Sequence, residues 1–275
     1  MKTLLALSLF TLAFEVLASL TYYPTETIEK FQAASISPNE LREEIFLLSE
    51  LVHIKVDGEH DILSDSCPKN TECTTQLDSM SYEEARRIMF GDLFLETTGN
   101  GQYTVKEVYC NKEINQNSGV GPGRIPNPNI INCEHTWPQS KFTSQFSKNM
   151  QKTDLHHLFP SDSKANSTRS NFIFAEVNGK ATNSSCLDSK IGNALGTQTR
   201  AFEPPIEHRG NVARALMYFS TRYKTQMDPL QLSYLKKWHE EDPVDEAEIA
   251  RNDKIMEIQR NRNPFIDFPE LVNKI

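Results

Sequence analysis

The sequence predicts one α+β domain that is mostly helical around a small antiparallel sheet. Apolar residues recur at helical spacing near both ends of the chain, and one central segment alternates as a half-buried strand does. The chain has 275 residues, which is enough for one large domain. Neither an internal repeat nor a low-complexity linker divides it, so one domain is the simplest architecture.

The N-terminus has the features of a secretory signal peptide over residues 1–18. Lys2 supplies a positive start, and an apolar run from Leu4 to Leu17 leads to a small-residue cleavage pattern ending at Ala18. A membrane-spanning helix needs about 20 apolar residues, and the polar stretch from Thr21 to Lys30 follows too soon. A buried N-terminal helix is the alternative. We therefore expect a secreted or periplasmic protein that makes no membrane contact.

The next residues are expected to form two regions. Residues 19–80 are predicted to be an acidic N-terminal segment packed on or next to the domain, and residues 81–275 to be the domain itself. Within the first region, Pro38 to Leu51 is predicted to be a helix, which Ser37 or Asn39 can cap. Its apolar stripe consists of Leu41, Ile45, Leu48 and Leu51.

Loops and one strand are expected in the first half of the chain. Val56 to Glu72 is polar and loop-like, whereas Ser81 to Phe90 begins with a capping-box pattern and is predicted to be helical. Gln102 to Tyr109 alternates polar and apolar residues, which predicts a strand. Asn115 to Asn132 is rich in Gly, Pro and Asn and is expected to be a long loop. After Asn171 the pattern is irregular as far as Pro205.

Three further helices are predicted in the last quarter of the chain. Asn211 to Lys224 carries an apolar face at helical spacing, and Pro229 to Trp238 is a shorter candidate. The last runs from Pro243 to Arg260, with Asp242 as its cap and acidic residues in its first turn.

Five cysteines are present in a chain that we expect to be exported: Cys67, Cys73, Cys110, Cys133 and Cys186. An oxidising compartment favours one or two disulfides. Cys67 and Cys73 are the easiest local pair. Cys133 could bridge to Cys110 or to Cys186, and spacing alone does not choose between them. The odd count leaves at least one cysteine free or intermolecular.

Charge is unevenly distributed along the chain, whose net charge is −8. Residues 1–100 contain 7 basic and 17 acidic side chains, residues 101–227 contain 15 and 9, and residues 228–275 contain 7 and 11. The centre is therefore locally basic between acidic flanks. This suits contact with phosphates there, although long-range attraction of a polyanion would be weak.

Two segments concentrate the reactive side chains, residues 133–138 and residues 154–171. Cutting a phosphodiester requires a base for water, and histidine suits this because its unperturbed pKa is about 6.5. A hard divalent cation, which prefers oxygen ligands, can stabilise the charge on the phosphate. His135 is a base of that kind, and Glu134 and Asn166 are oxygen ligands of that kind. Arg169 could contact a phosphate in bidentate fashion.

At these residues the chain resembles the bacterial endonuclease I family, whose core is a ββα-metal, or His-Me, finger. The resemblance covers roughly Ser81 to Val272 in the family's order. It depends on three motifs: Glu134-His135-x-Trp137-Pro138, Asp154-Leu155-His156-His157-Leu158-x-Pro160-Ser161-Asp162, and Asn166-Ser167-x-Arg169-x-Asn171. Supporting stretches are Asn211-Val212-Ala213-Arg214-Ala215-Leu216, Trp238-His239-x-x-Asp242-Pro243-Val244, Arg251-Asn252, and Asn261-Arg262-Asn263-Pro264-Phe265-Ile266-Asp267.

The resemblance implies a role for each of the central residues. His135 would be the general base, and Glu134 and Asn166 would bind a single Mg²⁺, with Ca²⁺ or Mn²⁺ as other candidates. His157 would orient the finger rather than bind metal. The products would carry a 5′-phosphate and a 3′-hydroxyl. The substrate would be DNA and also RNA, contacted through backbone phosphates with low sequence specificity, by a protein expected to be a monomer.

The sequence departs from the family pattern at two positions. Phe159 stands where members often carry an arginine, so one phosphate or structural contact is expected to be missing. Arg260 stands where glycine is usual, which is expected to alter a helix end. Trp137 is expected to be a core or wall residue.

Two other classes of function remain open. A secreted zinc hydrolase would use His135, His156 and His157, although the sequence has no His-Glu-x-x-His pattern. A nucleic-acid-binding protein without catalysis is the other alternative, and the presence of Glu134 and Asn166 argues against it.

Overall fold

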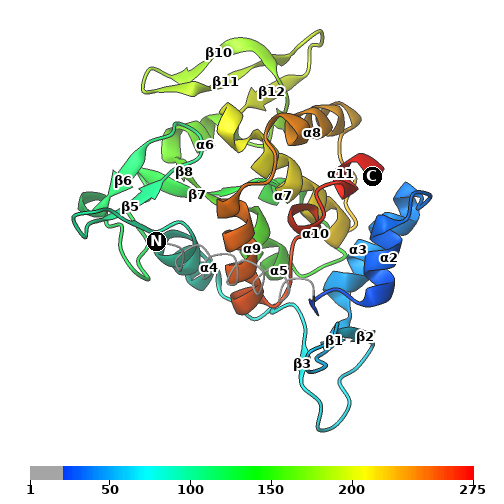
Figure 1. Cartoon of the computed structure of the whole chain (residues 1–275). Helices are drawn as coiled ribbons and strands as arrows, with labels where there is room; N and C mark the ends of the chain where they lie inside the picture. The colour runs from blue at the N-terminus through cyan, green and yellow to red at the C-terminus, as the bar shows by residue number, and fades with distance from the viewer. Residues whose placement is uncertain (1–20) are drawn as a thin grey trace, which may run out of the picture.

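The computed structural model describes residues 21–275, in which helices occupy the middle of the molecule and most of the four small sheets lie toward its edges (Figure 1). The predicted signal peptide, residues 1–18, lies outside the described residues. A mixed α+β fold is confirmed. The prediction of one small sheet was wrong, because short strands form separate sheets at four places in the described part of the chain.

The N-terminal region consists of two helices and a small antiparallel sheet. Helix α2 spans Thr25–Gln32 and α3 spans Pro38–Glu50. As predicted, Ser37 caps α3, in a complete capping box with Glu40. The sheet has the order β2-β1-β3, with β1 at Val52–Ile54, β2 at Ile62–Ser64 and β3 at Cys73–Thr74. The polar stretch predicted as a loop therefore contains one strand.

This region shares its hydrophobic core with the rest of the chain. Tyr23, Phe31 and Ile45 belong to the same buried cluster as Phe219 and Trp238. In Figure 1 the small sheet β1–β3 lies at the far end of the molecule from the hairpin β10–β11. The division at residue 81 stays a prediction.

The next section contains α4 and a three-stranded antiparallel sheet. Helix α4 spans Tyr82–Ile88, is capped by Ser81, and continues into a π-helical turn at Met89–Leu93. The sheet has the order β4-β5-β6, with strands at Glu96–Thr97, Tyr103–Lys106 and Glu113–Asn115. A short 3₁₀ turn follows at Gln116–Ser118.

Strand β5 ends earlier than the sequence predicts because of a buried carboxylate. Glu107, which is fully buried, accepts hydrogen bonds from the backbone N–H groups of Tyr109, Cys110 and Lys112. These bonds turn the chain back on itself. The same carboxylate accepts from the N–H of Asp162 at 2.7 Å, which ties this turn to the end of β8.

The centre of the molecule is a two-stranded antiparallel pair followed by a helix. Strand β7 spans Ile131–His135, and β8 spans Leu158–Asp162. Between them lie a 3₁₀ turn at Gln139–Lys141, helix α5 at Lys148–Thr153 and a 3₁₀ turn at Leu155–His157. Helix α6, at Ser163–Arg169, begins directly after β8.

The stretch predicted as irregular, residues 171–205, forms a four-stranded sheet instead. Its order is β10-β11-β12-β9, with β9 at Ile173–Phe174, β10 at Val177–Asn183, β11 at Cys186–Ala194 and β12 at Arg200–Glu203. The β12–β9 pair is parallel. Much of β10 is exposed, so its sequence lacks the apolar alternation that identifies a strand. Gly179 and Gly192 allow the two backbones of the hairpin to approach closely.

Helices fill the C-terminal part. They are α7 at Arg209–Arg222, α8 at Pro229–Glu241, α9 at Glu246–Gln259, α10 at Pro264–Asp267 and α11 at Leu271–Lys274, with a 3₁₀ turn at Ile206–His208 before them. The predicted cap of α9 was wrong: Asp245 caps it, whereas Asp242 accepts from the N–H of Gly210. Arg260 ends α9 in the left-handed conformation, with φ of 68°.

Two disulfides form among the described residues. The local pair Cys67–Cys73 is confirmed. The second bridge joins Cys110 to Cys186, so neither of the two pairings considered for Cys133 forms, and Cys133 is the cysteine that the odd count leaves over. Cys133 is free and buried on β7, and burial raises the pKa of its thiol to about 12.

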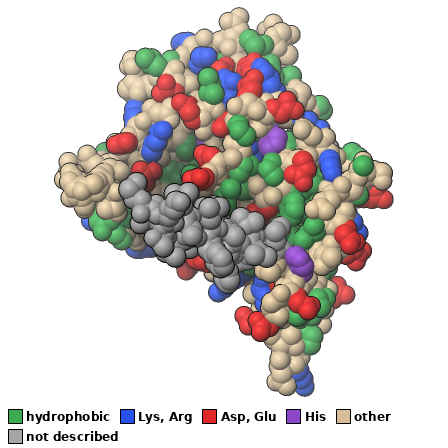
Figure 2. Space-filling view, viewed as in Figure 1, with side chains coloured by type: hydrophobic (Ala, Val, Ile, Leu, Met, Phe, Trp, Pro, Cys, Tyr) green, Lys and Arg blue, Asp and Glu red, His purple; other side chains and the backbone are tan. Residues whose placement is uncertain are grey.

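The surface shows no broad region of one charge on the face seen in Figure 2, as far as the described residues form it. Basic and acidic side chains are interspersed there. Within residues 21–275, no helix is long and apolar enough to cross a membrane.

Candidate active site on β7, β8 and α6

The predicted site residues lie on β7 and on α6, held together by the strand pair. Glu134 is paired with Phe159 across the β7–β8 ladder, and His135 with Leu158. Asp162, at the end of β8, accepts from the backbone N–H groups of Lys164 and Ala165 and thereby starts α6. The strand pair and its cap therefore fix the position of α6 relative to β7.

His135 is buried at the end of β7, with each ring nitrogen in a different environment. Its Nε2 lies 3.0 Å from the carbonyl oxygen of Lys152, which can only accept, so Nε2 carries the proton. Nδ1 is then the acceptor, and the side-chain amide of the exposed Gln139 donates to it at 3.3 Å. Burial lowers the pKa of His135 to about 3, with a further contribution from His157. The imidazole is therefore neutral at pH 7, with a lone pair on Nδ1.

Glu134 lies next to a buried arginine. Its Oε1 is 3.2 Å from Arg169 Nη1, and both side chains are only 2% exposed. Burial raises the pKa of Glu134, and the charge of Arg169 and the hydroxyl of Tyr109 offset this in part. Glu134 Oε1 accepts no hydrogen bond of normal geometry from the described residues. Arg169 is therefore the cation next to this oxygen, and the lone pairs of the oxygen, which accept no hydrogen bond, remain available to a second cation.

Asn166 faces β7 from the first turns of α6. Its Nδ2 donates to the carbonyl of Cys133 at 3.2 Å. This bond fixes the orientation of the amide and leaves Oδ1 as the group available to a ligand. The backbone carbonyl of Asn166 accepts from the N–H of Ser170, which is the normal helix-ending contact.

Arg169 does not lie where a phosphate contact would be expected. It is 2% exposed, and its guanidinium donates to the carbonyls of His135, Thr136 and Ser170. These bonds commit its Nη atoms to the backbone around the end of β7. These contacts indicate that Arg169 positions His135 and Glu134. A bidentate phosphate contact would instead require Nη donors that are free to bind the phosphate.

The structure brings some of the predicted residues together and separates others. Arg169 forms an ion pair with Glu134 and donates a hydrogen bond to the carbonyl of His135. Asn166, also on α6, donates to the carbonyl of Cys133 on the same strand. The ring of His135 instead contacts residues of α5 and the loop after β7. The two neighbouring side chains of β7 thus have different partners, as the alternation of a strand requires.

His156 and His157 are held in the framework. His157 Nε2 bonds to the carbonyl of Gln151 at 2.8 Å, and His156 Nε2 to the carbonyl of Asn261 at 3.3 Å. Burial lowers the pKa of both rings to about 4. Over residues 21–275, no group of three His, Cys, Asp or Glu side chains converges as a metal site. The geometry therefore gives no support to a zinc site built from His135, His156 and His157.

Other residues around the site agree with or extend the sequence analysis. Trp137 is buried and stacks on Phe219 with ring centroids 5.2 Å apart, which confirms its role in the core. Lys152 and Gln139 were missed. Gln139 follows the His135 motif closely and could have been considered, but the contribution of Lys152 to His135 is a backbone carbonyl, which no side-chain pattern reveals.

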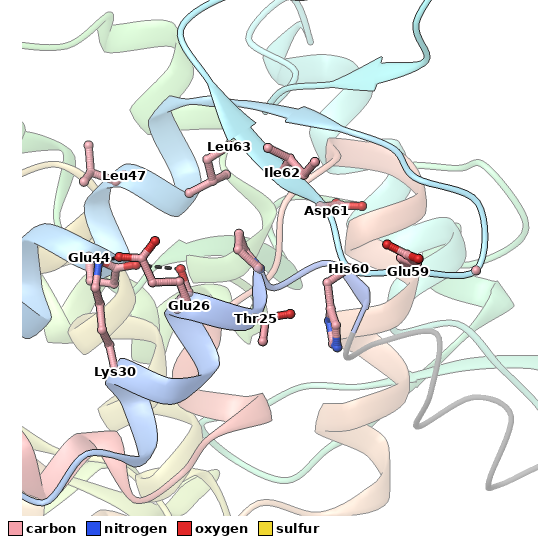
Figure 3. A pocket seen from close by; sticks show the side chains of 13 residues that line it. Thr25, Glu26, Lys30, Glu44, Leu47, Glu59, His60, Asp61, Ile62 and Leu63 are labelled. Atoms are coloured by element: carbon pink, nitrogen blue, oxygen red, sulfur yellow. Dashed lines mark hydrogen bonds and ion pairs between the residues drawn. The ribbon is translucent and has the colours of Figure 1, made fainter.

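A cavity of about 720 Å³ lies elsewhere, between α2, α3 and the loop before β2. Figure 3 shows Glu26, Lys30 and Glu44 at this cavity, together with Asp61. Lys30 is paired with both glutamates, at 3.0 and 2.9 Å. Acidic side chains outnumber basic ones in its lining, so the cavity would repel a polyanion. It holds none of the predicted site residues.

Known proteins with similar sequences carry the names of nucleases. The chain is 34% identical over 188 residues to a protein named "Extracellular ribonuclease" from Bacillus subtilis (strain 168), covering 61% of this chain and 60% of that protein. It is 33% identical over 120 residues to one named "Extracellular deoxyribonuclease" from Aeromonas hydrophila, covering 43% and 50%. The alignments thus span between half and about 60% of these relatives.

A family model also matches most of the chain. The model described as Endonuclease I matches residues 69–270, which include β7, β8, α6 and every predicted site residue. Because this match covers well over half of the sequence, the protein belongs to the endonuclease I family.

Proposed function

We propose that this protein is a secreted, metal-dependent endonuclease that hydrolyses phosphodiester bonds in DNA and RNA with low sequence specificity. The observation that carries the proposal is the environment of His135, a neutral imidazole whose Nδ1 lone pair is directed away from the Lys152 carbonyl. Export is supported by relatives whose names include "Extracellular ribonuclease" and "Periplasmic deoxyribonuclease".

The order strand, strand, helix at β7, β8 and α6 supports a ββα-metal core. The antiparallel pair presents His135 and Glu134, and α6 brings Asn166 against the same strand. The sequence contains no motif of a helix or ribbon that reads base edges, which supports contact through the backbone and therefore low sequence specificity.

A hard divalent cation fits the oxygen atoms that these residues offer. We infer that Glu134 Oε1, which lacks a hydrogen-bond donor, and Asn166 Oδ1, whose amide is oriented by the Cys133 carbonyl, would hold Mg²⁺, with Ca²⁺ or Mn²⁺ as other ions of suitable chemistry. When bound, such an ion stabilises negative charge on a phosphate. One carboxylate and one amide leave room for water ligands, which Mg²⁺ usually keeps.

The protein's own residues account for the acid–base part of the reaction. His135 Nδ1 accepts a proton from the attacking water, after the exposed Gln139 amide has moved aside. Lys152 holds the ring in the required tautomer from the other side. Arg169 fixes the backbone of His135 and Thr136 and so the direction of the base. Attack of the water on phosphorus with breakage of the P–O3′ bond would leave a 5′-phosphate, and the departing 3′ oxygen would take up a proton to give a 3′-hydroxyl.

The test is cleavage of supercoiled plasmid and of RNA by the purified chain, in Mg²⁺ and in chelator. We expect nicked, then linear, then smeared DNA in Mg²⁺ and no cleavage in chelator. His135→Ala should lower the rate by about 10²–10⁴-fold. Gln145→Ala, an exposed residue on the same loop, is the control and should keep the activity.

The outcomes separate the functional classes. Product ends that a DNA ligase joins without prior phosphorylation support the proposed end chemistry. Full activity of His135→Ala would overturn the assignment of the base. If the folded wild type binds DNA but cuts neither DNA nor RNA with Mg²⁺, Ca²⁺ or Mn²⁺, the protein is a binding protein and the endonuclease proposal fails.

A further inference from the structure

Tyr82, the first residue of α4, connects His135 to two basic side chains. Its ring lies 5.6 Å from the ring of His135, centroid to centroid. Lys152 Nζ lies 4.1 Å from the Tyr82 centroid, and the guanidinium carbon of Arg86 lies 4.7 Å from it. Two positive charges from α4 and α5 are therefore gathered on one aromatic ring that contacts the imidazole.

Neither of these two charges is paired with an acidic side chain. Within residues 21–275, Arg86 and Lys152 form no ion pair, and Arg86 Nε is buried without a hydrogen-bond partner. The adjacent Arg87 is different, because it pairs with Glu83 at 2.6 Å and donates to the carbonyl of Gly123. Two buried arginines elsewhere are also paired, Arg214 with Glu248 and Arg222 with Glu50.

An unpaired pair of cations is unfavourable in the free protein. Like charges repel, and the π-electrons of one tyrosine compensate each cation by only about 1 kcal/mol. A buried guanidinium nitrogen without an acceptor adds to this cost. An anion that contacts both side chains would offset the repulsion between them, and phosphate oxygens suit the geometry of a guanidinium.

We propose that Arg86 and Lys152 bind a backbone phosphate of the nucleic acid next to the phosphate that is cleaved at His135. This inference rests on the proposed endonuclease function and names the residues that hold its substrate. It also gives the phosphate contact to residues other than Arg169, whose Nη atoms donate to backbone carbonyls.

Lys152 has two parts in this arrangement. Its carbonyl oxygen fixes the tautomer of His135, and its ammonium group lies on Tyr82. A phosphate that contacts the ammonium group is therefore held by the same residue that orients the base. Tyr82 acts as a positioning residue, because its ring keeps both cations beside the imidazole.

The experiment measures binding of a short fluorescein-labelled DNA duplex by anisotropy, on the His135→Ala background to prevent cleavage, at several salt concentrations. The variant is Arg86→Gln with Lys152→Gln. Each phosphate contact contributes about 0.9 to the slope of log Kd against log salt. The variant should lower this slope by about 2 and raise Kd about tenfold at moderate salt.

The matched control is Arg87→Gln with Lys148→Gln, which removes the same charge from the same two helices at exposed positions. Its slope and Kd should stay close to those of the parent. In the His135 wild-type background, the test variant should raise KM for plasmid far more than it lowers kcat. Urea unfolding of all variants checks that the fold is retained.

The outcomes distinguish this inference from the proposed function. If the wild type cuts DNA and the Arg86/Lys152 variant keeps the parent's slope, Kd and KM, the phosphate site is wrong and the endonuclease stands. An equal loss of slope in the control variant would also overturn the site, because the effect would then be one of net charge. If the wild type neither binds nor cuts nucleic acid, the proposed function itself fails.

Discussion

The Nε2 atom of His135 donates a hydrogen bond to the backbone carbonyl of Lys152 at 3.0 Å. These residues are 17 positions apart, on β7 and α5, and the contact is made by a main-chain atom. Since a carbonyl only accepts, this one bond decides which nitrogen of the imidazole can act as a base.

The tautomer of His135 should therefore be observable directly. At pH 7 its ring should carry the proton on Nε2 and the lone pair on Nδ1, and long-range ¹H–¹⁵N correlation spectra report this from the two nitrogen shifts. His135→Ala assigns the signal by its disappearance. A ring protonated on Nδ1 would contradict the geometry and the role that we propose for it.

Replacing Arg169 should mainly lower the stability of the fold. Arg169→Gln leaves the buried Glu134 without its partner and three carbonyls without a donor, so the free energy of unfolding should fall by about 3–5 kcal/mol. Urea unfolding measures this. The exposed Arg200→Gln is the control and should change stability by less than about 0.5 kcal/mol. A stable Arg169→Gln protein with weakened DNA binding would instead restore the phosphate contact that the sequence suggested.

Acid should destabilise the fold through His208. Burial lowers the pKa of His208 to about 3, helped by the charge of Arg251, whereas the unfolded chain has a histidine pKa of about 6.5. Between these values the unfolded state binds more protons, so stability falls as the pH drops below about 6.5. At pH 5 the cost is about 2 kcal/mol.

The variant that tests this prediction is His208→Asn. Its unfolding free energy, measured in urea at pH 7 and pH 5, should fall less between the two values than that of the wild type. Subtracting the fall in unfolding free energy of the variant from that of the wild type separates the contribution of His208 from that of the other buried histidines. An identical fall in both proteins would show that His208 is protonated in the native state or is not the group responsible.

The end of α9 offers a stabilising substitution. Arg260 has φ of 68°, a conformation in which glycine is favoured over any residue with a Cβ atom. Arg260→Gly should raise the free energy of unfolding by about 1 kcal/mol. Arg260→Ala removes the same charge but keeps the Cβ, so it should stay near the wild type. A gain in the alanine variant as large as in the glycine variant would assign the effect to charge.

Local signals in the sequence were sufficient for many of the elements. Ser37 begins α3 and Pro229 begins α8 because capping and proline geometry act within a single turn. The family resemblance, confirmed by the match over residues 69–270, and the pair Cys67–Cys73 were also predictable from neighbouring residues.

Other features needed the folded chain. The hairpin joins β10, which is largely exposed and polar, to β11, whose buried residues do not alternate regularly, so the sequence has no strand pattern to recognise. The bridge from Cys110 to Cys186 closes a separation of 76 residues, and no spacing rule selects it over the alternatives with Cys133. Both depend on which segments the packed core brings together.

The candidate site divides in the same way. Residue chemistry and motif are sufficient to identify Glu134, His135 and Asn166. The donors and acceptors that the reaction requires belong to side chains that lie close in sequence or in a known order. Tertiary structure decided the other features of the site. It set the tautomer of His135 and directed the hydrogen bonds of Arg169 to backbone carbonyls. It also placed Arg86 and Lys152 against the ring of Tyr82. Those contacts join separate elements, and a hydrogen bond or a ring contact forms only after packing has placed both partners within reach.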